Sequence, residues 1–264
     1  MHSPTLDEFL KLAEQSNLIP VTRRLLADIE TPLSAYRKIR GVGESFLFES
    51  VEGGEHLGRY SFVGCNPRAV IKQTGNRVEV IENGKVIEDF LIAEKTLTRP
   101  ADTLSHPMGE GRGEGAMVKD GLEVVERVMK KYRAVSLPGL PRFTGGAIGF
   151  VGYEFIHDIE PVVPRPPHDE LQMSTMVFLI ADQLLIFDRV AQTITVLVNA
   201  VVESGISPVE AYEDATSEID RLVALLAQPS EHNPVTLLAD VPSIPFESNV
   251  PKEKFSSNVL KAKE

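Results

Sequence analysis

Two residues of opposite charge, each close to apolar residues in the sequence, are the first candidates for chemistry. Glu49 belongs to the run Phe46-Leu47-Phe48-Glu49-Ser50-Val51, and Arg59 belongs to the run Gly58-Arg59-Tyr60-Ser61 that follows a short connection. In an extended strand, Glu49 shares a face with Leu47 and Val51, where an unpaired carboxylate is costly. We therefore expect Glu49 to have a cation or hydrogen-bond donors as its partner.

Two interpretations of this pair remain open from the residues alone. If Gly53-Gly54 forms a two-residue turn, Glu49 lies opposite Gly58, whose missing side chain leaves room for the ammonium group of a ligand. Arg59 then shares a face with Ser50. The alternative is an ion pair between Glu49 and Arg59 at a sheet edge, with no ligand involved.

Other polar residues indicate structure rather than catalysis. The six histidines lack the spacing of a helical metal site, so a zinc centre is not expected. His157 and Asp158 follow a strand pattern, where polar residues usually face solvent or form a turn. Cys65 is the single cysteine, which excludes an internal disulfide framework, and it fits a small buried residue.

Two glycine-rich segments resemble nucleotide-binding loops only in composition. The segment 110–115 carries acids that repel phosphate, and it lacks the Lys-Ser/Thr pair of a phosphate-binding loop. The segment 145–149 lies inside a strand pattern, which favours close backbone packing over dinucleotide binding. We therefore expect no nucleotide site in this chain.

The composition limits the partners. The chain has 264 residues, and Asp plus Glu outnumber Lys plus Arg by 38 to 27, for a formal net charge of -11. This charge repels a phosphate backbone, so no nucleic-acid partner is expected. No apolar run is long enough to span a membrane, and polar residues follow Met1 in place of a signal segment. We expect a cytoplasmic protein without membrane contact.

Hydrophobic periodicity predicts a mixture of helices and strands, with a glycine-rich and proline-rich loop at 96–116 and an extended segment at 161–167. Residues 174–180 fit neither the helical nor the strand periodicity clearly. The Asn83-Gly84 pair is a strong hairpin signal. Helices are predicted at 6–17, 32–40, 121–133 and 208–226, and strands at 19–27, 45–51, 57–63, 77–81, 85–90, 143–153, 183–188 and 193–199.

The last helical pattern begins at Pro251, and its apolar residues Phe255, Val259 and Leu260 have nothing in the sequence to cover them. We therefore expect the chain to be part of a longer protein. The expected organisation is a domain over 1–235, a linker over 236–249 and the start of a second domain over 250–264.

Several segments, taken in order, resemble the N-terminal half of component I of anthranilate synthase. They are Phe48-Glu49-Ser50, Gly58-Arg59-Tyr60-Ser61-Phe62-Val63-Gly64, Phe143-Thr144-Gly145-Gly146-Ala147-Ile148-Gly149-Phe150-Val151-Gly152-Tyr153-Glu154, and the closing run from Phe246 to Glu264. The resemblance implies an α+β fold with two packed antiparallel sheets and helices outside, which agrees with the predicted order of elements. It also implies that 1–235 is a regulatory and partner-binding domain.

The resemblance further implies a function for the whole parent protein. That family makes anthranilate and pyruvate from chorismate, with ammonia from a glutamine amidotransferase subunit, and it uses Mg²⁺. Its catalytic and metal-binding residues would lie beyond Glu264, so this fragment alone is expected to be inactive and to bind no cofactor. The family's feedback site for L-tryptophan matches Phe48, Glu49 and Ser50, with Arg59 as its basic residue. The alternatives are component I of aminodeoxychorismate synthase and a non-catalytic module that binds an amino acid.

Overall fold

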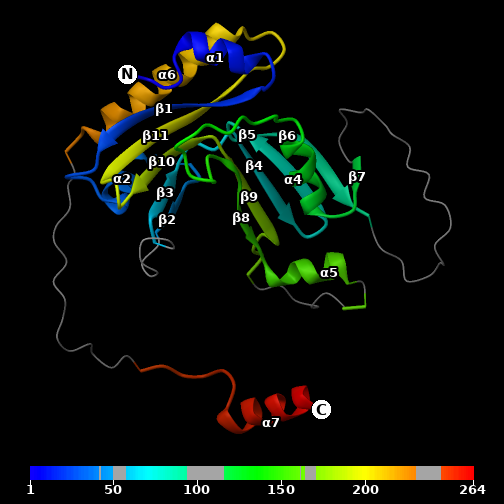
Figure 1. The fold of residues 1–264 in the computed structure, drawn as a ribbon. Coiled ribbons are helices and arrows are strands. Elements are labelled where there is room, and N and C mark those ends of the chain that lie inside the picture. Colours follow the sequence, from blue (N-terminus) through cyan, green and yellow to red (C-terminus); the bar gives the residue numbers. More distant parts are fainter. Residues whose placement is uncertain (42, 50–57, 94–115, 161, 164–170, 230–244) are drawn as a thin grey trace. The chain divides into compact units, whose positions relative to one another are not determined.

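The computed structural model describes residues 1–41, 43–49, 58–93, 116–160, 162–163, 171–229 and 245–264 (Figure 1). The chain divides into two compact units, Met1–Ser230 and Glu231–Glu264. The second unit contains α7 (Lys252–Lys263), in which Phe255, Val259 and Leu260 are exposed. The boundaries expected at 235 and 249 remain predictions. No helix in the described part of the chain is long and apolar enough to cross a membrane.

The first sheet, here called sheet A, has five strands in the order β1-β11-β10-β3-β2, and all neighbours are antiparallel. It brings segments far apart in the sequence side by side, because β1 near the N-terminus pairs with β11. Its strands are β1 (Leu18–Leu26), β2 (Phe46–Phe48), β3 (Tyr60–Gly64), β10 (Gln183–Asp188) and β11 (Thr193–Val201).

The second sheet, sheet B, has six strands in the order β7-β6-β5-β4-β9-β8. The expectation of purely antiparallel sheets is wrong at one edge, because β7 runs parallel to β6. A parallel neighbour requires a long connection, and the residues between β6 and β7 supply one. The strands are β4 (Ala69–Thr74), β5 (Arg77–Glu82), β6 (Lys85–Ile92), β7 (Ala116–Val118), β8 (Gly146–Val151) and β9 (Met176–Ala181).

Helices cover the outer faces of both sheets, which confirms the α+β class with two packed sheets and outer helices (Figure 1). Sheet A packs against α1 (Leu6–Ala13), α2 (Pro32–Ile39) and α6 (Pro208–Leu226). Sheet B packs against α4 (Gly121–Met129), with η1 (Tyr153–Phe155) and α5 (Ile156–Ile159) following β8. A third apolar cluster lies between the inner faces of the two sheets.

Four helices begin at a residue whose side chain caps the helix. Thr5 and Glu8 form a capping box on α1, and Thr31 caps α2 ahead of Pro32. Asp120 and Ser207 cap α4 and α6 by accepting hydrogen bonds from backbone N–H groups. Because each cap satisfies donors that the helix leaves unpaired, it fixes where the helix begins.

The two sheets share one corner, where the chain crosses between them twice. Residues 65–68 lead from β3 into β4, and Asp182 leads from β9 into β10. The Nη2 atom of Arg68 lies 2.8 Å from Oδ2 of Asp182, and the Arg68 N–H donates to the Ile180 carbonyl at 2.9 Å. Burial raises the pKa of Asp182 to about 6, although Arg68 acts in the opposite direction. This ion pair ties the two crossings together.

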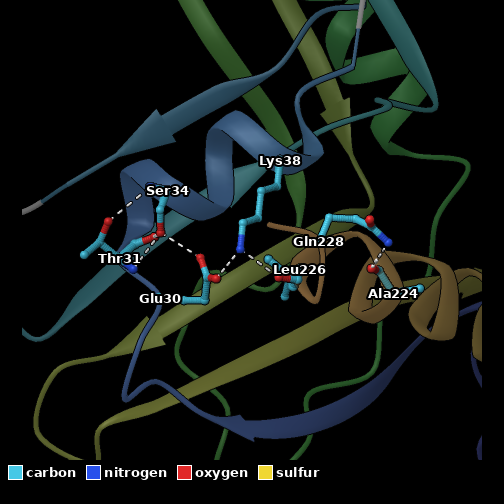
Figure 2. A network of polar contacts seen from close by, with 7 residues as sticks. All are labelled: Glu30, Thr31, Ser34, Lys38, Ala224, Leu226 and Gln228. Atoms are coloured by element: carbon cyan, nitrogen blue, oxygen red, sulfur yellow. Dashed lines mark hydrogen bonds and ion pairs between the residues drawn. The ribbon is translucent and has the colours of Figure 1, made fainter. Parts of the chain in front are cut away.

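A second polar network joins α2 to the end of α6 (Figure 2). Lys38 forms an ion pair with Glu30, and its Nζ atom donates to the Leu226 carbonyl at 2.8 Å. The Ser34 hydroxyl donates to the same Glu30 carboxylate at 2.7 Å. A lysine that binds a C-terminal carbonyl satisfies an acceptor that the helix leaves open.

Candidate functional site

The expected site lies at the end of the β2–β3 hairpin, at an edge of sheet A. Phe48 is the last residue of β2, Glu49 follows it as an exposed residue, and Arg59 directly precedes β3. Ser50 and the Gly53-Gly54 turn lie outside the described residues. The hairpin predicted from the sequence is confirmed, because β2 and β3 pair antiparallel.

The predicted register of this hairpin is wrong. Phe46 pairs with Gly64, and Phe48 pairs with Phe62. A two-residue turn at Gly53-Gly54 would have placed Glu49 opposite Gly58, but this register runs toward Ser61 instead. Since a shift by an odd number of residues exchanges the two faces of a strand, the space above Gly58 cannot be assigned to Glu49.

Arg59 pairs with Asp188 and not with Glu49, so the alternative ion pair suggested by the sequence is also wrong. Its Nε atom donates to Asp188 Oδ1 at 3.0 Å, and its Nη2 atom donates to Oδ2 at 2.6 Å. The guanidinium also lies over the Tyr60 ring, 5.0 Å from its centroid. This two-pronged geometry is the strong form of an arginine–carboxylate contact.

Asp188 organises both the arginine and the turn that follows β10. Its Oδ1 atom accepts hydrogen bonds from the backbone N–H groups of Val190 at 3.0 Å and Ala191 at 3.1 Å. The hydrogen bonds from Arg59 hold the pKa of Asp188 below its usual range, and the backbone donors act in the same direction. The two contacts between Arg59 and Asp188 use the Nε and Nη2 atoms of Arg59.

Aromatic side chains line the inner face of sheet A beside this pair. The rings of Phe46 and Phe48 lie 5.5 Å apart, and Phe62 meets Phe143 edge to face at 5.4 Å. Phe48 is the outermost of these residues, and half of its surface is exposed. The end of the hairpin therefore carries an exposed aromatic ring at Phe48, an exposed carboxylate at Glu49 and the guanidinium of Arg59.

Cys65 has the structural role that the sequence indicated, but Asp158, which was expected to face solvent or form a turn, lies buried in α5. Cys65 is buried, and burial raises the pKa of its thiol to about 12, so the reactive thiolate is suppressed. Asp158 is buried and accepts a hydrogen bond from Gln73, whereas the His157 ring contacts the Val163 carbonyl. The segment 110–115 and most of the expected loop at 96–116, like most of the extended segment at 161–167, lie outside the described residues.

Within the described ranges, no group of three or more His, Cys, Asp or Glu side chains could hold a metal ion. The glycine-rich strand also packs as expected, because a Cβ atom on Gly149 would lie 2.8 Å from the Phe178 Cα atom. Asp188 is the one partner that sequence reasoning missed at this site. Asp188 lies at the end of a predicted hairpin strand, which indicates a turn residue. No pattern in the sequence indicated its pairing with Arg59.

The whole chain is similar to curated proteins named anthranilate synthase component 1. The protein from Acetivibrio thermocellus is 32% identical over 269 residues, which cover 100% of this chain and 48% of that protein. The protein from Synechocystis is 33% identical over 273 residues, with 100% and 48% covered. The protein from Pseudomonas putida is 32% identical over 227 residues, with 84% and 40% covered. The chain spans about half the length of the curated relatives it matches.

A crystal structure of anthranilate synthase component I from Streptococcus pneumoniae matches with a TM-score of 0.49 and 21% identity, over 91% of this chain and 44% of that chain. No protein-family model matches. The fold and the curated relatives define an α+β domain of an enzyme family. The chain belongs to the anthranilate synthase component 1 family, and it corresponds to the N-terminal half of those proteins.

Proposed function

We propose that this chain is the regulatory half of an anthranilate synthase component I. The complete protein converts chorismate and ammonia to anthranilate and pyruvate, and L-tryptophan inhibits it by binding at the end of the β2–β3 hairpin. The observation that carries this proposal is the 32% identity over the whole chain with a protein named for that activity.

The hairpin end supports the tryptophan part of the proposal. Phe48 offers an apolar surface to the indole, Glu49 offers a carboxylate to the ammonium group, and Arg59 offers a guanidinium to the carboxylate. Ser50 belongs to the same proposed site by its position next to Glu49. Arg59 acts here as half of an ion pair with Asp188, which orients its guanidinium before any ligand arrives.

The catalytic part of the proposal concerns residues that this chain does not include. Mg²⁺ and chorismate are assigned to the half of the relatives that the chain does not match, because the described residues offer no carboxylate cluster for the ion. A glutamine amidotransferase subunit supplies ammonia in the cytoplasm. The name component 1 of the relatives supports the existence of a second component.

Two measurements test the proposal. Anthranilate fluorescence is followed with chorismate, ammonia and Mg²⁺, for the complete component I and for the chain of 264 residues. We expect product from the complete protein, inhibition of it by L-tryptophan, and no product from the shorter chain. Formation of aminodeoxychorismate in place of anthranilate would favour the alternative synthase.

The second measurement uses the absence of tryptophan from this sequence. Emission excited at the indole band then comes only from added L-tryptophan. Transfer of the indole from water to the apolar surface at Phe48 is expected to shift the emission to shorter wavelength. Affinity in the chain of 264 residues equal to that of the complete component I, measured in parallel by equilibrium dialysis with labelled L-tryptophan, would favour a free-standing module that binds an amino acid.

A further inference from the structure

Sheets A and B end in four edge strands in the described part of the chain, and three of these edges are protected. The strands β2 and β7 have only three residues each. The strand β1 contains Pro20 and Arg23, and Ser3 forms a bridge with Thr22 along its outer side. Short length, charge, proline and a covering segment are the usual means by which proteins keep an edge from pairing with another strand.

The fourth edge strand, β8, lacks these protections. Its six residues, Gly146–Val151, include no charged residue and no proline. Phe150 and Val151 are 47% and 44% exposed, and as successive residues of a strand they lie on opposite faces of sheet B. An uncharged edge that exposes apolar side chains on both faces is a template for another strand.

The backbone of β8 directs hydrogen-bonding groups toward this edge. A Cβ atom on Gly149 would overlap the Val177 carbonyl oxygen, so this carbonyl points at β8, where Val177 pairs with Phe150. Because the backbone groups of alternate residues point to the same side of a strand, Ile148 and Phe150 face β9, whereas Gly149 and Val151 face outward. Within the described ranges, no backbone hydrogen bond joins Gly149 or Val151 to a segment beyond this edge.

The occupant that fits this edge is a strand of the same polypeptide. The chain spans 48% of the length of the curated relatives that match all of it, so those proteins contain about as much sequence again. A strand tethered to the same chain meets the edge at an effective concentration on the order of millimolar. A second copy of the protein meets it only at the protein's concentration in solution. The tethered strand therefore has the advantage.

We propose that β8 is an interaction surface at which sheet B is extended in the complete component I, by a strand from the half of the protein that this chain does not match. The added strand bonds to the outward backbone groups of Gly149 and Val151 and covers part of the exposed Phe150 and Val151 side chains. This inference rests on the proposed assignment of the chain to a complete component I, but it does not depend on tryptophan binding.

The test measures amide hydrogen exchange in the complete component I, resolved to single residues by electron-transfer fragmentation and mass spectrometry. The amides of Ile148 and Phe150 are the internal reference, because they face β9 whether or not a further strand is present. We expect the amides of Gly149 and Val151 to exchange as slowly as this reference. Exchange at Gly149 and Val151 on the order of a hundredfold faster would show a free edge and overturn the proposal.

The same measurement at two protein concentrations, tenfold apart, identifies the occupant. Protection of Gly149 and Val151 that does not change with concentration supports a tethered strand. Protection that appears only at the higher concentration would overturn the tethered strand in favour of a second copy. A complete protein that protects these amides but makes no anthranilate would contradict the proposed function and leave this inference intact.

A pair of variants tests the outward N–H group directly. Val151→Pro removes this group and places a ring where the added strand would lie, whereas Val151→Ala keeps the group. Proline is tolerated at such a position only when the edge is free. We expect Val151→Pro to lower the melting temperature of the complete component I by at least about 2 °C more than Val151→Ala does. Equal melting temperatures would overturn the proposal, and the exchange measurement on the wild type decides it if Val151→Pro fails to fold.

Discussion

Glu30 and Lys38 form an ion pair that is almost closed to solvent, with 13% and 9% of their side-chain surfaces exposed. The pair joins the residue before the cap of α2 to its last turn, and Lys38 also holds the final carbonyl of α6 (Figure 2). A charge in such a place is tolerated only while its partner is present.

Lys38→Met is therefore expected to destabilise the protein by about 3–5 kcal/mol, because it leaves the Glu30 carboxylate buried without a cation. The double variant Glu30→Gln with Lys38→Met should recover part of this loss. Urea unfolding measures both free energies, and Arg37→Met serves as the control because Arg37 is the exposed neighbour of Lys38. Equal stability of the single variant and the control would contradict a buried ion pair.

Asp182 is expected to make stability depend on pH. Its pKa is raised from 3.8 to about 6 by burial, so the folded protein binds the proton more tightly than the unfolded chain does. Stability from this group is therefore present below pH 3.8 and is lost as the pH rises to about 6. The loss reaches up to about 3 kcal/mol.

Urea unfolding between pH 4 and pH 7 checks this. At low pH, Asp182→Asn should be less stable than wild type. This difference in the free energy of unfolding should shrink as the pH rises, because the variant has no titrating carboxyl group at this position. Asp214→Asn, which removes an exposed carboxyl group, is the control. Parallel pH curves for wild type and Asp182→Asn would show that the folded protein does not raise this pKa.

Glu49→Ala should weaken inhibition by L-tryptophan about tenfold or more, because a hydrogen bond to a charged group contributes roughly 1.5–3 kcal/mol. Turnover without inhibitor should not change. The measurement is the concentration of L-tryptophan that halves anthranilate formation by the complete protein. Glu44→Ala removes an exposed carboxylate of the same type shortly before β2 and should leave inhibition unaltered. Normal inhibition in a folded Glu49→Ala protein would rule out Glu49 as the ammonium ligand.

Gly149→Ala should disrupt the pairing of β8 with β9. The added Cβ atom would overlap the Val177 carbonyl and lie 2.8 Å from the Phe178 Cα atom, so backbone must move. We expect a loss of about 1–3 kcal/mol in the free energy of unfolding. Gly43→Ala is the control, since nothing lies within 4 Å of its Cβ position. A tolerated Gly149→Ala would mean that β8 can move away from β9 at little cost.

The sequence predicted those features that depend on neighbouring residues. The Asn83-Gly84 turn is confirmed, with positive φ at both residues. The strand β9, which the sequence left ambiguous, and the strand β4, which it did not predict, pair with each other inside sheet B. Their side chains are buried on both faces over much of their length, so the alternation that marks a half-buried strand is weak.

The site was predictable only in part, for the same reason. The adjacency of Phe48 and Glu49 and the β2–β3 hairpin are local and were predicted. The register was not, because Phe48 pairs with Phe62, whereas a two-residue turn at Gly53-Gly54 would have paired Phe48 with Arg59. Asp188 was missed because β10 brings it to Arg59 from 129 positions away in the chain.

The pairing of β1 with β11 also sets the order in which the chain can fold during synthesis. Leu18 to Leu26 find their partners at Val201 to Thr193, so β1 leaves the ribosome long before the strand that it needs. At the usual 5–20 residues per second, this delay is on the order of ten seconds or more. The hairpin of β5 and β6 can form in that time, whereas Ile19 and Val21 stay exposed. The nascent chain therefore passes through a period in which a chaperone that shields its first strand would protect it from aggregation.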